Sequence, residues 1–155
     1  LFFSNPIIIN DNKIIVSTDP YLYIIDLISG ATIFKISITS IVKPVFSGNN
    51  IFIVTKDNLL VCIRADTGEL AYSVDINQEI ADFFDTKKKI VNIKSLSTIN
   101  NNIFIFLKNS YVIKFDLKGK IDQINKLPAK LKSFPIFVNE RILFLNKKNK
   151  LVIID

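Results

Sequence analysis

The sequence contains no histidine, no tryptophan, no methionine and only one cysteine. Without histidine, the chain cannot form a Ser-His-Asp triad, a histidine-ligated zinc site or an imidazole general base. The lone Cys62 lies between Val61 and Ile63 and has no partner for an internal disulfide, so we interpret it as a small buried hydrophobic residue. These absences remove the commonest groups of hydrolytic and redox catalysis.

Glycine is scarce as well, and none of the four residues forms a G-x-G-x-x-G or P-loop motif. The acidic residues are dispersed. Asp19, Asp57 and Asp66 fall in separate predicted turns, whereas calcium ligands converge on one point. Asp82 and Asp85 lie in a polar segment without a predicted pocket. We therefore predict that the protein is not an enzyme, and we expect no catalytic residue, cofactor, metal site or small-molecule substrate.

Long hydrophobic runs are missing, although 49% of the residues are hydrophobic and the mean hydropathy is +0.35. No apolar stretch reaches 18 residues, so no transmembrane helix is predicted, while peripheral membrane association stays open. The apolar content instead indicates strands that are buried on both faces.

The net charge is +6, but arginine contributes only Arg64 and Arg141 to the 20 basic residues. The lysines are scattered through predicted turns and strand edges, apart from the run Lys87-Lys88-Lys89. A nucleic-acid surface more often gathers its charge and favours arginine. We therefore expect a solvated basic surface and no nucleic-acid partner.

The strongest feature that is present is an internal repeat. The segment 6–34 aligns without a gap on 44–72, an offset of 38 residues that pairs proline with proline, glycine with glycine and aromatic with aromatic. A weaker third copy includes Asn102–Leu107 and Tyr111–Asp116, and a fourth begins at Pro135. A repeat of this period is typical of propellers and related arrays.

Each copy contains short runs rich in Ile, Val, Phe, Leu and Tyr that are separated by turn residues, a pattern that predicts β-strands. The short turns require neighbouring strands to run antiparallel. In the first copy the expected strands are Pro6–Ile9, Lys13–Thr18, Tyr21–Asp26 and Thr32–Ile38. Helical periodicity is poor, and only Asn77–Phe84 could form a helical turn or two.

These patterns predict an all-β chain with one domain, 1–155, made of about four four-stranded antiparallel units. We expect the units near 6–38, 44–76, 97–127 and 135–155, with an insertion at 78–96. The fourth copy reaches residue 155 without a fourth run, so we expect the units to belong to a larger ring of seven or eight blades.

A local motif, D-x-x-S/T-G-x-x-x-aromatic, marks the third turn of the first copies. It resembles the PQQ-like repeat of bacterial β-propellers, in which a tryptophan occupies the aromatic position; this chain has smaller aromatic residues there and Gln123 in the third copy. The glycine permits a left-handed turn, and the aromatic side chain can wedge against the next blade. The motif residues are Asp26, Ser29, Gly30 and Phe34 in the first copy, Asp66, Thr67, Gly68 and Tyr72 in the second, and Asp116 and Gly119 in the third.

In character the chain is most similar to the family of the outer-membrane protein assembly lipoprotein BamB, within a PQQ-like or WD40-like propeller architecture. This resemblance implies a non-enzymatic scaffold for protein–protein interaction in the periplasm, associated with the outer membrane. The implied partner is a protein, in that family a β-barrel assembly component, and no cofactor is implied. Phe83 and Phe84, in the insertion, form a candidate partner loop.

Two alternatives stay open. One is a sensory or ligand-binding PQQ-like propeller domain of a larger bacterial protein. The other is a fragment of a quinoprotein dehydrogenase, although such enzymes stack the quinone between a tryptophan and a disulfide of adjacent cysteines, which this chain lacks.

Overall fold

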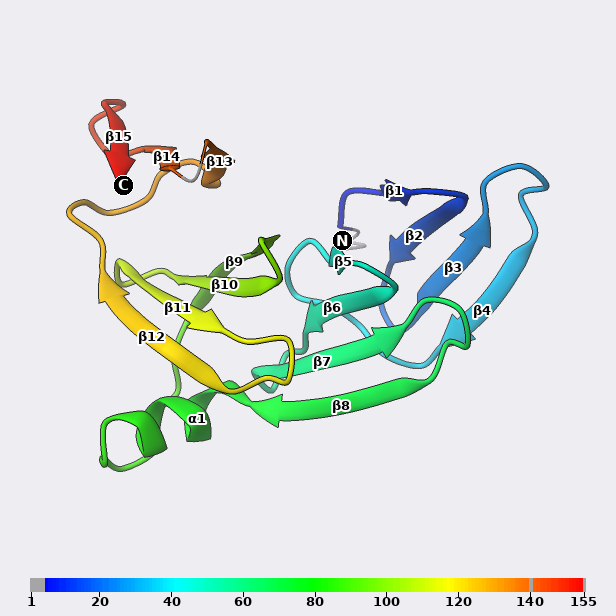
Figure 1. Cartoon of the computed structure of the whole chain (residues 1–155), viewed down its shortest axis with the longest axis horizontal. Helices are drawn as coiled ribbons and strands as arrows, with labels where there is room; N and C mark the ends of the chain where they lie inside the picture. The colour runs from blue at the N-terminus through cyan, green and yellow to red at the C-terminus, as the bar shows by residue number, and fades with distance from the viewer. Residues whose placement is uncertain (1–4, 140, 155) are drawn as a thin grey trace.

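Four consecutive antiparallel sheets make up most of the molecule, which is known from a computed structural model that describes residues 5–139 and 141–154 (Figure 1). Blade 1 contains β1 (Ile8–Asn10), β2 (Lys13–Ser17), β3 (Leu22–Asp26) and β4 (Thr32–Ile36). Blade 2 contains β5 (Val45–Ser47), β6 (Asn50–Val54), β7 (Leu59–Arg64) and β8 (Leu70–Asp75). Blade 3 contains β9 (Ile93–Ile99), β10 (Asn102–Leu107), β11 (Tyr111–Phe115) and β12 (Ile121–Lys126). Blade 4 contains β13 (Ile136–Val138), β14 (Arg141–Leu145) and β15 (Leu151–Ile154).

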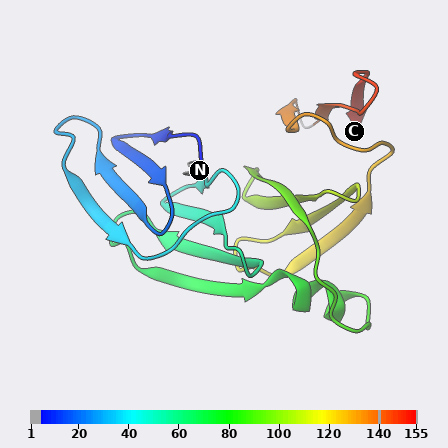
Figure 2. The same ribbon diagram turned by 180° about the vertical axis from the view of Figure 1, so that it is seen from behind.

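Within each sheet the strands pair in sequence order, so each blade is a meander. The blades follow one another along an arc, with β1, β5, β9 and β13 on its inner side and β4, β8 and β12 on its outer side (Figures 1 and 2). The predicted all-β class with four-stranded antiparallel units is confirmed, and blade 4 has three strands among the described residues.

The hairpins form where the sequence supplies residues that tolerate positive φ. The first hairpin of every blade turns at such a residue: Asp11, Gly48, the pair Asn100 and Asn101, and Asn139, with φ values between 46° and 57°. In each complete blade the register shifts between the two outer strands, after Ile24, Cys62 and Lys114. This recurrence shows that blades 1 to 3 are copies of one local structure.

The core lies between the blades rather than inside any one of them. Ile15, Leu22 and Ile24 of blade 1 cluster with Ile51 and Ile63 of blade 2. Residues of blade 2 that face the other way form a second cluster with blade 3, and blades 3 and 4 share a third. As a result β6 and β7 are buried on both faces, which accounts for the high apolar content of the sequence.

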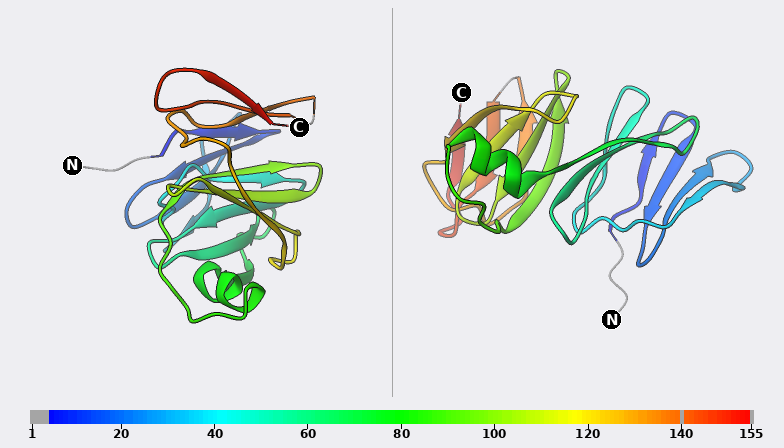
Figure 3. Two further views of the ribbon diagram at one scale, coloured as in Figure 1. Left: turned by 90° about the vertical axis from the view of Figure 1, so that its left-hand side faces the viewer. Right: turned by 90° about the horizontal axis from the view of Figure 1, so that it is seen from below.

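The insertion differs from the sequence expectation in its bounds. A helix, α1 (Ile76–Phe83), directly follows β8 and contacts β8 and β12 at the outer side of the arc (Figure 3). Strand β9 already begins at Ile93, so blade 3 starts before residue 97 and the insertion ends before residue 96. Residues 1–4, 140 and 155 of the predicted domain lie outside the described residues. No helix in the described ranges is long and apolar enough to cross a membrane.

Candidate functional site

The motif residues of neighbouring blades meet at the blade junctions. A β-carbon built on Gly68 of blade 2 would lie 2.7 Å from Cγ of Phe34, which belongs to blade 1. A β-carbon on Gly119 of blade 3 would lie 2.9 Å from Cε2 of Tyr72, which belongs to blade 2. Both glycines have φ of 70° or more, so a larger residue would strain the backbone of the turn. Its side chain would also collide with the ring that lies on the glycine.

Tyr72 adds a polar contact to this junction. Its hydroxyl donates a hydrogen bond of 2.7 Å to the carbonyl of Leu117, in the turn of blade 3. Burial raises the pKa of Tyr72 well above its ordinary value, with the neighbouring Cys62 and Asp116 as smaller causes, so the hydroxyl stays protonated and can donate. A tyrosine thus gives this junction a hydrogen bond that the Phe34 ring cannot give.

The aspartates of the motif do not share one role. Asp26 Oδ1 accepts hydrogen bonds from the backbone N–H and hydroxyl of Ser29, both at 2.7 Å, and these bonds lower the pKa of Asp26. Asp116 Oδ1 likewise accepts from two backbone N–H groups of its turn. In blade 2 the corresponding backbone position is Arg64, whose carbonyl accepts from Gly68 as that of Asp26 accepts from Gly30. Asp66 lies two residues beyond that position, as the gapless repeat of 38 residues indicates, and does not take the place of Asp26.

Two further motif positions, the residue before the turn glycine and the aromatic position, also differ between the blades. Thr67 Oγ1 accepts a bond of 3.3 Å from the N–H of Glu69 within its turn. Gln123, at the aromatic position of blade 3, lines a cavity of about 360 Å³ between blades 3 and 4. At this junction the aromatic position thus borders a cavity instead of holding a ring.

The insertion carries a second group of exposed residues, at the outer rim. Phe83 and Phe84 are 46% and 51% exposed, and their rings meet edge to face with centroids 5.3 Å apart. Ile90 is 84% exposed, and the lysine run 87–89 separates it from the aromatic pair. We call residues 82–90, all exposed, the rim loop.

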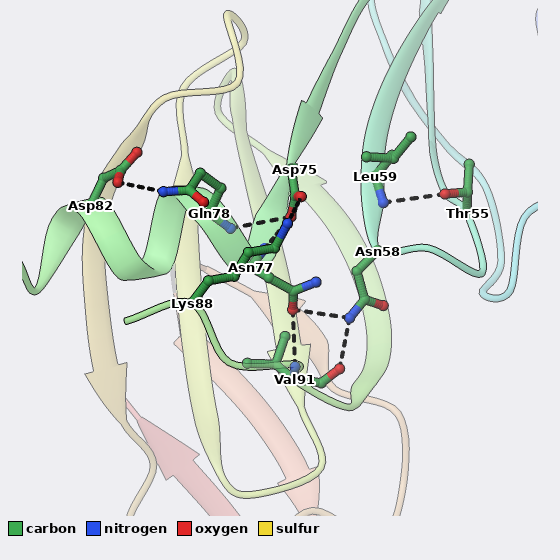
Figure 4. A network of polar contacts seen from close by, with 9 residues as sticks. All are labelled: Thr55, Asn58, Leu59, Asp75, Asn77, Gln78, Asp82, Lys88 and Val91. Atoms are coloured by element: carbon green, nitrogen blue, oxygen red, sulfur yellow. Dashed lines mark hydrogen bonds and ion pairs between the residues drawn. The ribbon is translucent and has the colours of Figure 1, made fainter. Parts of the chain in front are cut away.

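Polar contacts of Asp75 fix the start of α1 (Figure 4). Asp75 caps α1, because its Oδ1 accepts from the backbone N–H groups of Asn77 and Gln78 at 2.9 and 3.1 Å. The Lys88 ammonium pairs with the other carboxylate oxygen, and this bond is the main cause that lowers the pKa of Asp75. The cap and the rim loop are therefore tied to the same side chain.

A buried amide pair holds the far end of the rim loop (Figure 4). Asn77 Oδ1 accepts from the backbone N–H of Val91 at 2.9 Å, and Asn58 Nδ2 donates to the carbonyl of Val91 at 2.8 Å. Asn58 and Asn77 also bond to each other and are 6% and 5% exposed. Nothing in the sequence distinguishes these two asparagines from exposed ones, because their burial depends on the folded contacts around them.

A third feature is a groove of about 750 Å³ on the inner side of the arc, formed by the inner strands of all four blades and the linkers before them. Lys94 lies in it and donates to the carbonyls of Leu131 and Lys132, joining blade 3 to the segment before blade 4. Desolvation lowers the pKa of Lys94. No group of three or more potential metal ligands occurs among the described residues.

Comparisons with known proteins show the fold. No family model matches the sequence, and no curated protein matches it either. BamB from Moraxella catarrhalis superposes with a TM-score of 0.77 at 15% identity, over 96% of this chain and 42% of that chain. The computationally designed protein Ika8 gives 0.69 at 12% identity, over 95% and 44%. The quinohemoprotein alcohol dehydrogenase ADHIIG from Pseudomonas putida HK5 gives 0.60 at 19% identity, over 83% and 22%.

The chain is thus structurally similar to β-propellers, and its blades are propeller blades. It spans less than half the length of each of these three chains.

Proposed function

We propose that the protein is a non-enzymatic β-propeller scaffold that binds a protein partner through its rim loop. The observation that carries this proposal is the exposed apolar group Phe83, Phe84 and Ile90, held by a cap, an ion pair and a buried amide pair. An aromatic centre bordered by charges of both signs has the composition of a protein–protein interface.

The proposed setting is outer-membrane protein assembly in the periplasm. The similarity of the blades to BamB from Moraxella catarrhalis over 96% of this chain supports that setting, together with the resemblance of the sequence motifs. The partner would then be a β-barrel assembly component, contacted by the rim loop while the blades supply a rigid support.

The test measures binding of the purified protein to the β-barrel assembly component of the same organism. The variant F83A/F84A should weaken binding about tenfold or more, because buried aromatic side chains dominate such interfaces. Phe134→Ala is the matched control, since Phe134 is 71% exposed but lies in the inner groove. Circular dichroism verifies that both variants are folded.

The inner groove supports a second candidate, a ligand-binding or sensory propeller. If Phe134→Ala abolishes binding while F83A/F84A has no effect, the contact surface is the groove and the rim-loop proposal is wrong. If the unaltered protein does not bind the β-barrel assembly component, the proposed role in outer-membrane protein assembly is wrong.

A further inference from the structure

Lysines that are scattered in the sequence gather at the junction of blades 3 and 4. Lys94, near the start of β9, donates to the carbonyls of Leu131 and Lys132 at 2.8 and 2.9 Å, in the linker before blade 4. Leu131 forms a β-bridge with Asn146, and the Lys132 ammonium donates to the side-chain oxygen of Asn149. These contacts bring β9 and the linker against the turn between β14 and β15.

The turn after β10 adjoins the same place. The backbone N–H of Lys108 donates to the carbonyl of Asn92 at 2.8 Å, beside the start of β9. Desolvation and, after it, the charges of Lys108 and Lys147 lower the pKa of Lys94, because both ammonium groups lie near it. Since each blade is a meander, these turns and the linker lie at one end of the strands. The seven lysines there, which we call the lysine face, are Lys94, Lys108, Lys130, Lys132, Lys147, Lys148 and Lys150.

The lysine face has no carboxylate that balances its charge. Its segments, 92–94, 107–110, 127–135 and 144–150, contain neither aspartate nor glutamate. Within the described residues the two ion pairs involve Lys88 and Lys114, which lie outside this face. All the lysines of the face are exposed except Lys94, which is partly buried. Like charges held together without a counter-charge attract an external anion.

The composition of the lysine face distinguishes between anionic partners. Protein–protein interfaces are depleted in lysine, and nucleic-acid recognition favours the planar fork of arginine, which this face lacks. A group of about four to eight basic residues instead suits a membrane surface with anionic lipid headgroups, which it binds by charge alone. Phe134, in the same linker, is 71% exposed and offers a ring to the apolar boundary beneath the headgroups.

We propose that the lysine face binds a bilayer surface that carries anionic phospholipids. The ammonium groups contact the phosphate-bearing headgroups, and Phe134 enters the interface beside them. The lysine face shares no residue with the rim loop, so this proposal and the proposed partner contact can fail independently.

Sedimentation with lipid vesicles tests the proposal. The purified protein should bind vesicles of phosphatidylcholine mixed with phosphatidylglycerol and should not bind vesicles of phosphatidylcholine alone. The variant K147Q/K148Q should lower the partition coefficient about 25-fold, since each lysine at an anionic surface contributes about fivefold. Phe134→Ala should lower it about tenfold, because its ring no longer leaves water on binding.

Two further variants make the comparison specific. K108Q/K130Q removes the same charge from another part of the lysine face and should weaken binding as K147Q/K148Q does. K87Q/K89Q removes the same charge from the rim loop and is the matched control, which should bind within about twofold of the unaltered protein because distant exposed charges are screened. Circular dichroism verifies that the variants are folded, and either face variant is sufficient for the comparison.

Three results would overturn the proposal. One is absence of binding to the anionic vesicles. Another is an equal loss for the face variants and K87Q/K89Q, which would mean that net charge alone drives binding. The third is displacement from the vesicles by duplex DNA or by polyglutamate at equal charge concentration, which would assign the lysine face to a nucleic acid or to an acidic protein.

Discussion

At the residue scale, the blade junctions depend on the pairing of a ring with a glycine. The sequence indicated that Phe34 and Tyr72 lie on outer strands and face the next blade, because the motif places them four residues after the turn glycine. It could not show that the ring lies on the glycine of the following turn, since that contact depends on the stacking of two blades. The burial of Cys62, in contrast, was predictable from its apolar neighbours and is confirmed.

Removing the hydroxyl of Tyr72 should measure the polar part of one junction. Tyr72→Phe keeps the ring on Gly119 but leaves the carbonyl of Leu117 without its donor. We expect the free energy of unfolding to fall by about 1 kcal/mol, the net value of one such hydrogen bond. Chemical denaturation at pH 7 provides the measurement. Tyr23→Phe is the control, because Tyr23 lies on the face of blade 1 that does not pack against blade 2. An equal loss for Tyr23→Phe would contradict the role of the Tyr72 hydroxyl.

At the element scale, strands were predictable and their tertiary contacts were not. The alternation and turn residues of the first copy predict Lys13–Thr18, and β2 spans Lys13–Ser17, because both signals are local. The fourth run ends at Ile36 instead of Ile38. The helix at 76–83 stayed undecided in the sequence, since eight residues form a stable helix only with help from capping and packing.

The helix cap gives a prediction for this element. Asp75→Ala removes the acceptor of two backbone N–H groups and the partner of Lys88. We expect the free energy of unfolding at pH 7 to fall by about 1 kcal/mol, as for other N-cap residues. Denaturation of both proteins as a function of pH provides the measurement.

The pH dependence of that difference follows from the pKa of Asp75, which is lowered from its ordinary value of 3.8 by the Lys88 bond and the capping bonds. A lowered pKa in the folded state means that the carboxylate stabilises the fold fully above pH 3.8 and loses this contribution as the pH falls further. The two proteins should therefore differ at neutral pH and converge in acid. A difference that grows below pH 4 would contradict the assigned role.

At the scale of the whole molecule, stability depends on how many neighbours each blade has. Among the described residues, blades 2 and 3 pack against a neighbouring blade on both faces, whereas blades 1 and 4 each pack against one neighbouring blade. In such arrays stability is close to a sum of the units and their nearest-neighbour contacts. The repeat in the sequence was enough to predict the blades and their order. How tightly two neighbouring blades pack depends instead on the individual side chains at their junction.

Amide hydrogen exchange should reveal this gradient. We expect the slowest exchange in β6, β7, β10 and β11, where most side chains are buried, and faster exchange in β13–β15, which contain several exposed residues. The physical reason is that opening blade 4 breaks a single junction, and that junction includes the cavity lined by Gln123. Mass spectrometry of peptides from each blade makes the comparison within one sample. If β14 exchanged as slowly as β6, the blades would open as one unit, and blade-to-blade contacts would not set local stability.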